Sequence, residues 1–121
     1  MSRTEALNAI LRSIQAATPE IEASALISED GLMIASAMPQ HVDEMRVAGM
    51  SSTILMLGQR AATELKRGHL EQVLIRGAEG YVVMVNAASG TMLLVLAGHD
   101  AKLGLIFLDM NKAVKEISKI L

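Results

Sequence analysis

The chain of 121 residues suits one domain covering residues 1–121, with an apolar fraction of 51% and a formal charge of −2. This weak charge, together with only one Tyr and one Phe, excludes a basic or base-stacking surface for nucleic acid. The absence of Cys excludes disulfides and thiolate chemistry, and no apolar run reaches the length of a membrane span, so we expect a soluble, cytoplasmic protein.

Local signals divide the chain into helices and strands. Ser2 and Glu5 form a capping-box pattern at the start of a first helix, and Pro19 ends that helix. Asp30-Gly31 is typical of a tight hairpin turn, and Asp100 is a plausible cap for the last helix. The expected elements are a helix over 3–17, strands over 23–27 and 32–37, a helix over 42–66, strands over 70–76, 81–86 and 91–97, and a last helix that ends near the C-terminus.

The last three strands are apolar at successive positions, as in the run Val82–Val85. A strand that is wet on one face would carry a polar residue at every second position. We therefore expect helices on both faces of a mainly antiparallel sheet. Three helices over two faces leave one face with a single helix.

The long helix over 42–66 carries apolar or small residues on three sides, where an ordinary surface helix would carry charges. We predict that one stripe packs on the sheet, a second stripe of small residues packs on a second copy, and a Met-bearing stripe lies on the far side. The alternative is a helix enclosed in a crowded core of its own chain. In that order, the stripes are Val47, Met50, Ile54, Leu57, Ala61 and Leu65; Ala48, Ser51, Leu55, Gly58 and Ala62; and Met45, Ser52, Met56 and Thr63.

Residues that could carry chemistry are scattered. His41, His69 and His99 fall in loops or at element ends without a partner at metal-ligand spacing, which favours surface or capping roles. Glu29 and Asp30 could act as paired carboxylates, but a hairpin turn explains Asp-Gly for backbone reasons alone. No phosphate loop or nucleophile elbow is present. We predict no catalytic residue, no cofactor and no bound metal.

The order of elements, the hairpin segment 28–36, the segment Gly80–Val83 and the segment Leu103–Leu105 together resemble the Roadblock / dynein light-chain-seven superfamily, specifically its short prokaryotic MglB-like members. The likeness covers essentially the whole chain. It implies an α/β (α+β) fold of order αββαβββα, with a five-stranded antiparallel sheet and a profilin-like/Roadblock architecture. The second helix would cover one face of the sheet, and the first and third helices the other.

The resemblance also implies a homodimer in which the second helices pair and the third strands join into one sheet. Such pairing would protect an exposed strand edge from aggregation. The predicted dimer interface consists of Ala48, Ser51, Leu55, Gly58, Ala62, Leu70, Gln72 and Leu74.

By the same resemblance, the dimer is a non-enzymatic signal-transduction module that binds a small Ras-like GTPase and modulates its nucleotide cycle. Other Roadblock chains or a sensor kinase are further expected partners, without nucleic acid and without membrane insertion. Arg46 and Arg60 are formally candidates for an arginine finger, although the family tends to remodel the GTPase. The predicted partner-binding residues are Met45, Arg46, Gly49, Ser52, Met56 and Arg60.

Two alternatives stay open. The first is a structural scaffold that binds other Roadblock-type chains or helical peptides without regulating a GTPase. The second is a small-molecule enzyme, which would need a polar pocket that the sequence does not offer.

Overall fold

The expected order αββαβββα is confirmed in the computed structural model, which describes residues 2–121. Most boundaries differ from the sequence-based ranges by one or two residues, as is usual for element ends. The elements are α1 (Arg3–Ala17), β1 (Ile21–Ser28), β2 (Met33–Ala37), α2 (Glu44–Glu64), β3 (Gln72–Gly77), β4 (Gly80–Asn86), β5 (Thr91–Gly98) and α3 (Leu103–Ile120).

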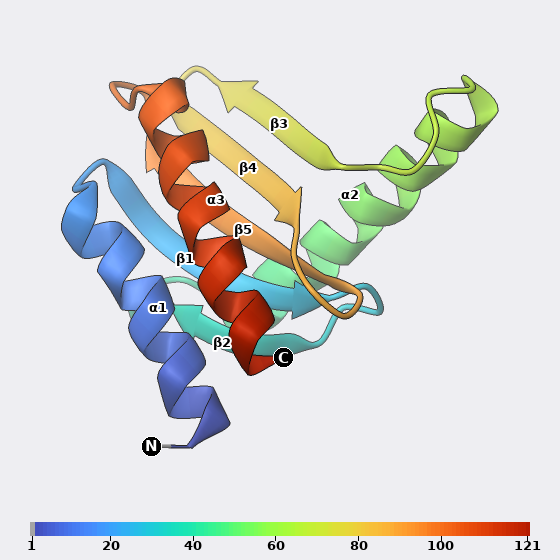
Figure 1. Cartoon of the computed structure of the whole chain (residues 1–121). Helices are drawn as coiled ribbons and strands as arrows, with labels where there is room; N and C mark the ends of the chain where they lie inside the picture. The colour runs from blue at the N-terminus through green and yellow to red at the C-terminus, as the bar shows by residue number, and fades with distance from the viewer. Residues whose placement is uncertain (1) are drawn as a thin grey trace.

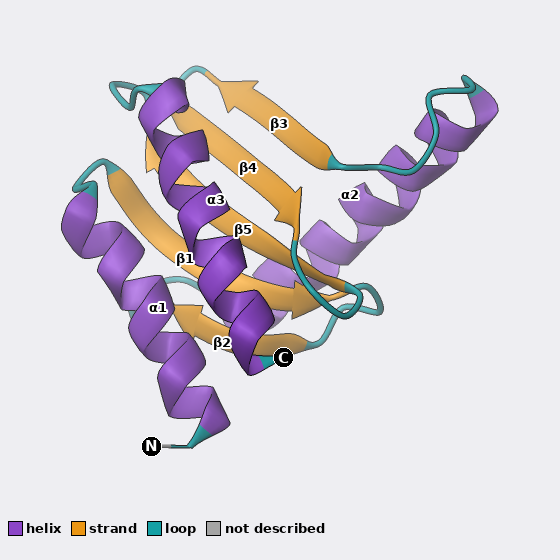
Figure 2. Cartoon of the chain, viewed as in Figure 1, coloured by secondary structure: helices purple, strands orange, loops and turns teal. Residues whose placement is uncertain are grey.

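The five strands form one antiparallel sheet in the order β2-β1-β5-β4-β3, so β3 is an edge strand with one unpaired side. Helices α1 and α3 lie side by side in front of the sheet in Figure 1, and α2 crosses behind it. Figure 2 shows the three resulting layers of helices, sheet and single helix. None of the helices among residues 2–121 is long and apolar enough to cross a bilayer.

Each face of the sheet has its own apolar core, as the doubly apolar strands predicted. The larger core lies under α1 and α3 and includes Leu11, Val83 and Ile106. The smaller core lies under α2 and includes Ile27, Leu55 and Met84. The single helix over the second face therefore covers less of the sheet than the two helices opposite. In Figure 1 the C-terminal part of α2 extends past the strands.

The helix starts show which capping predictions were right. The Ser2 hydroxyl oxygen accepts a hydrogen bond from the backbone N–H of Glu5 at 3.1 Å, which confirms the cap of α1. Asp100 as the cap of α3 was wrong, because the N-cap is Lys102 and its side chain makes no capping hydrogen bond. The Ala101 N–H donates to the Gly98 carbonyl and forms a turn in which Ala101 is buried. The helix therefore begins after this turn, at Leu103.

Candidate protein-interaction surface

The most buried residues of α2 are two small residues and one leucine. Ala48, Ser51 and Leu55 are only 4%, 4% and 7% exposed within this single chain. They were predicted to face a second copy, and that prediction was wrong for these three residues, because their own sheet already covers them. Gly58 and Ala62, from the same predicted stripe, are half-buried.

Gly58 lies close to the segment that leads into β3. A Cβ atom added to Gly58 would lie 3.1 Å from Leu70 Cδ2 and 3.6 Å from Val73 Cγ2. These atoms are the ends of side chains, so a larger residue at this position would require Leu70 to shift by a few tenths of an ångström. The small residue at position 58 therefore fits the close packing of α2 against Leu70.

The large aliphatic residues of α2 lie on an adjoining side that is open to solvent. Met50, Leu57 and Leu65 are 60%, 59% and 68% exposed, so their predicted packing on the sheet was wrong. Val47 and Ile54 are half-buried and pack against the smaller core, as predicted, and Ala61 is exposed. We call these six residues the apolar side of α2: Val47, Met50, Ile54, Leu57, Ala61 and Leu65.

The same face of the sheet stays partly open over β3 and β4. Ile75 is paired with Val82, which is paired with Leu96, and all three project on the α2 face. Ile75 is 40% exposed, while Val82 and Leu96 are half-buried. Because β3 also has an unpaired edge, an apolar helix side, an uncovered sheet face and a free strand edge occur in one region of the molecule.

The remaining residues predicted for the dimer interface belong to the first part of β3 and the turn before it. Leu70 is half-buried beneath α2, and Gln72 is exposed. Leu74 is 44% exposed and pairs with Val83 of the larger core, so its side chain projects on the α1 and α3 face. These residues do not share one side-chain face, so their contribution to an interface along the β3 edge would come from the backbone.

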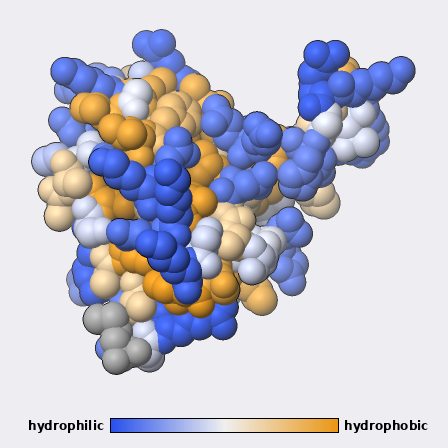
Figure 3. Space-filling model, viewed as in Figure 1, coloured by the Kyte–Doolittle hydropathy of each residue, from blue (hydrophilic) through white to orange (hydrophobic). Residues whose placement is uncertain are grey.

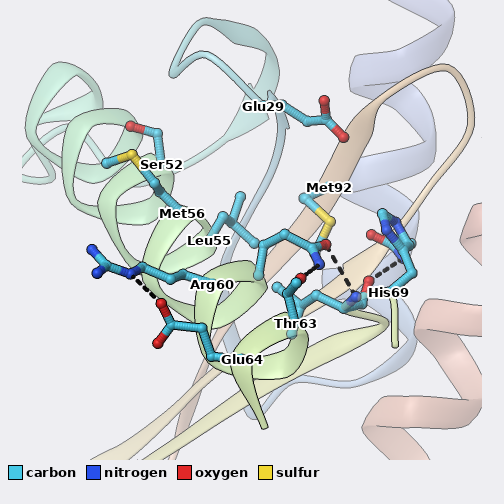
Figure 4. Close-up of a pocket in the computed structure, with 12 residues that line it drawn as sticks. Glu29, Ser52, Leu55, Met56, Arg60, Thr63, Glu64, His69 and Met92 are labelled. Carbon is cyan, nitrogen blue, oxygen red and sulfur yellow. Dashed lines mark hydrogen bonds and ion pairs between the residues drawn. The ribbon is translucent and has the colours of Figure 1, made fainter. Parts of the chain in front are cut away.

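The predicted partner-binding residues lie along the third side of α2. Met45 is 86% exposed and Met56 is 67% exposed, while Arg46, Gly49 and Arg60 are exposed and Ser52 is half-buried. Ser52, Met56 and Arg60 line one wall of an open pocket of about 800 Å³ (Figure 4). Arg60 Nε lies 3.1 Å from Glu64 Oε1 in an exposed ion pair that contributes little to stability.

The opposite wall of this pocket could not be found from helical spacing. Glu29 comes from the β1–β2 turn, Met92 from the start of β5, and His69 and Leu70 from the segment before β3. Only the antiparallel topology brings these strand ends together. The pocket lining is mostly apolar, and no group of three or more His, Asp or Glu side chains within residues 2–121 gathers to hold a metal.

Two side-chain amides fix the segment between α2 and β3. The Leu70 N–H donates to Gln59 Oε1 at 3.1 Å, and the Leu70 carbonyl accepts from Asn86 Nδ2 at 2.6 Å. Gln59 Nε2 also donates to Thr63 Oγ1 within the helix. This clamp ties the start of the edge strand both to α2 and to the end of β4.

We expect Gln59→Ala to destabilise the domain by about 1–2 kcal/mol, because it leaves a partly buried N–H without its acceptor. Hydrogen exchange should quicken at Leu70 and along β3, and urea unfolding should report the lost stability. The control is Gln40→Ala in an exposed loop, expected to change stability by less than about 0.5 kcal/mol. Unchanged exchange at Leu70 in Gln59→Ala would contradict the clamp.

The fold and this surface define a profilin-like α/β domain in which one helix exposes an apolar side. The chain belongs to the Roadblock/LC7 domain family, whose model matches residues 7–97. It is 39% identical over 100 residues to the uncharacterized protein MJ1340 of Methanocaldococcus jannaschii, covering 83% of this chain and 87% of that protein.

Solved structures agree on the fold. Myxococcus xanthus MglB superimposes with a TM-score of 0.89 at 21% identity, over 99% of this chain and 90% of that chain. A Roadblock/LC7 domain from Streptomyces avermitilis gives 0.87 at 24% identity, over 93% and 94% of the two chains. LokiProfilin2, from its complex with rabbit actin, gives 0.70 at 12% identity over the full length of both chains. The expected Roadblock and profilin-like architecture is thereby confirmed.

Proposed function

We propose that this protein is a dimeric, non-enzymatic regulatory module of the cytoplasm that binds a small Ras-like GTPase and modulates its nucleotide cycle. The observation that supports a dimer is the apolar side of α2, which lies beside an uncovered sheet face and the unpaired edge of β3. The GTPase is the partner class that the resemblance to MglB-like proteins implies.

Burial of apolar area supports the dimer. A standard interface covers about 800 Å² per partner, roughly a tenth of the 7277 Å² that this chain exposes. Pairing of two α2 helices would cover Met50, Leu57 and Leu65, whose exposure in a single copy is unfavourable. Joining the two β3 edges would satisfy backbone groups that no strand within residues 2–121 pairs.

The third side of α2 supports the choice of docking site for the GTPase. Met45 and Met56 offer flexible apolar contacts, and Arg46 and Arg60 offer charge next to them. This side adjoins the pocket walled by Glu29 and His69, so a protruding partner segment could enter it. In the proposed dimer, these residues from both copies would form one platform.

Titration of purified GTPases encoded near this gene, loaded with GDP or with a non-hydrolysable GTP analogue, tests the proposal by calorimetry. We expect binding that differs between the two nucleotide states and is at least tenfold weaker for Met56→Glu. Arg12→Glu, on an exposed position of α1 across the sheet, is the matched control and should bind normally. Absence of binding in both nucleotide states would exclude these GTPases as partners.

Hydrolysis assays separate two modes of regulation. If Arg60 acted as an arginine finger, Arg60→Ala would lower GTP hydrolysis by about 10³–10⁵-fold. Under the remodelling mode that we propose, Arg60→Ala and Arg46→Ala change hydrolysis no more than they change binding. If no GTPase binds but other Roadblock chains form mixed dimers with this one, the scaffold alternative replaces the proposal.

A further inference from the structure

The two edges of the sheet differ in how their outward backbone groups are satisfied. β2 and β3 are the edge strands of the order β2-β1-β5-β4-β3, so each has one side that pairs with no other strand within residues 2–121. Such an edge can add a strand from another chain, and soluble proteins usually protect it. The edge without protection is therefore the one at which a second chain can join the sheet.

A side chain of α1 covers the outward side of β2. The backbone N–H of Ser36 donates to Asn8 Oδ1 at 3.1 Å, although Ser36 lies opposite Ala25 of β1. Because this N–H bonds to a side chain outside the sheet, it points away from β1, to the side where an added strand would lie. Asn8 is half-buried, and α1 packs along β2 (Figure 1). The backbone donor that an added strand would need is thus already bonded.

β2 is also bent by a bulge and held from the other face of the sheet. Ala35 and Met33 lie opposite consecutive residues of β1, so Ile34 between them is the extra residue of a β-bulge. A bulge bends an edge strand and interrupts its pairing. The Ser36 hydroxyl donates to Glu44 Oε2 of α2 at 3.0 Å. Only the short segment after the bulge stays straight, and its outward N–H is the one that Asn8 binds.

β3 shows neither feature. Its register with β4 is continuous over the whole strand, without a bulge. Just before the strand, the Glu71 carbonyl accepts from the Asn86 N–H of β4 and so points inward. Alternate residues after Glu71 therefore direct their N–H groups to the free edge, namely Gln72, Leu74 and Arg76. Among residues 2–121, the side-chain hydrogen bonds to this part of the backbone stop at Leu70, before the strand begins.

The space beside β3 is open as well. In Figure 1 the C-terminal end of α2 extends past β3, and Figure 3 shows a hollow between this hydrophilic end and the body of the molecule. The outward edge of β3 borders that hollow. A strand can approach β3 there without displacing a helix, whereas at β2 it would have to displace the Asn8 side chain.

We propose that Asn8 is an edge cap that excludes a second copy of this chain from β2, so that the sheet extends through β3 alone. Pairing of two copies about a two-fold axis at one edge closes at a dimer, whereas pairing at both edges would continue into an open fibre. The cap itself does not depend on the proposed function. Its effect on the size of the assembly rests on the proposed dimer.

Amide hydrogen exchange of the full chain tests the cap. In Asn8→Ala the Ser36 N–H loses its acceptor and should exchange at least about tenfold faster than in the unchanged chain. Asn8→Asp keeps an oxygen acceptor and should leave the exchange at Ser36 unchanged. Asn111→Ala, the same chemical change at an exposed position of α3, should also leave it unchanged. Alanine favours a helix more than asparagine does, so circular dichroism of Asn8→Ala should stay native. Unchanged exchange at Ser36 in Asn8→Ala would overturn the proposal.

Light scattering at rising protein concentration tests the effect on assembly. Asn8→Ala should grow beyond the dimer, because both edges then pair, while Asn8→Asp and Asn111→Ala should keep the mass of the unchanged chain. In the Leu57→Glu background, which should lose the dimer at α2 and β3, Asn8→Ala should stop at a dimer. If the unchanged chain is a monomer, the proposed dimer fails, but the cap still predicts self-association of Asn8→Ala. A constant mass of Asn8→Ala at every concentration, or equal growth of Asn8→Asp, would overturn the proposal.

Discussion

Leu57→Glu is expected to convert the proposed dimer into a folded monomer. Leu57 is 59% exposed in a single chain and lies at the centre of the apolar side of α2. In the proposed dimer its counterpart would bury it, and an unpaired buried carboxylate costs several kcal/mol. That cost corresponds to a dissociation constant weakened by at least about 100-fold. Light scattering should report a molar mass near 12.9 kDa instead of twice that value.

Leu55→Glu is the informative comparison, because it lies only two residues away on the buried side of the same helix. Leu55 is 7% exposed in the smaller core, so its replacement should unfold the chain rather than dissociate it. Leu105→Glu, on α3, changes a leucine that is 52% exposed and should leave the dimer intact. A folded monomer from Leu55→Glu together with a dimer from Leu57→Glu would restore the stripe order that the sequence alone suggested.

The error in that order has a physical cause. Helical periodicity shows that α2 has more than one apolar stripe, but it does not show which stripe faces the sheet. The periodicity of the large aliphatic residues favours packing of their stripe on the sheet. In the structure, the stripe that contains the small residues faces the sheet instead. Ala48 and Ser51 are buried against the sheet, and Met50 and Leu57 are exposed.

Helix starts and buried strands could be predicted from the sequence because they depend on residues that are close together in the chain. The capping box at Ser2 predicted the start of α1, and the apolar runs in β4 and β5 predicted that both faces of the sheet are covered. The pocket beside α2 could not be predicted from the sequence in this way. Its walls combine the turn at Glu29 with Met92 and His69, which are brought together by the sheet order rather than by spacing along the chain.

A glycine in the β4 segment shared with the family motif should be the position most sensitive to a single methyl group. A Cβ atom on Gly80 would lie 2.4 Å from the Ala97 carbonyl oxygen, and that oxygen belongs to the backbone of the central strand β5. A flexible side chain could move aside, but a strand paired on both edges cannot do so without breaking its ladder. The close approach of β4 to β5 therefore requires glycine at this position.

We expect Gly80→Ala to destabilise the domain by about 2–4 kcal/mol, which is the upper range for an inserted methyl group against a rigid neighbour. Gly49→Ala makes the same chemical change on α2, where a Cβ atom meets nothing within 4 Å, and should stabilise the helix by about 0.5–1 kcal/mol. Urea unfolding of both variants, in the Leu57→Glu background to remove the dimer contribution, measures the difference. Equal stabilities would show that β4 can move away from β5, and the sheet register would then not explain why the Gly80–Val83 segment begins with glycine.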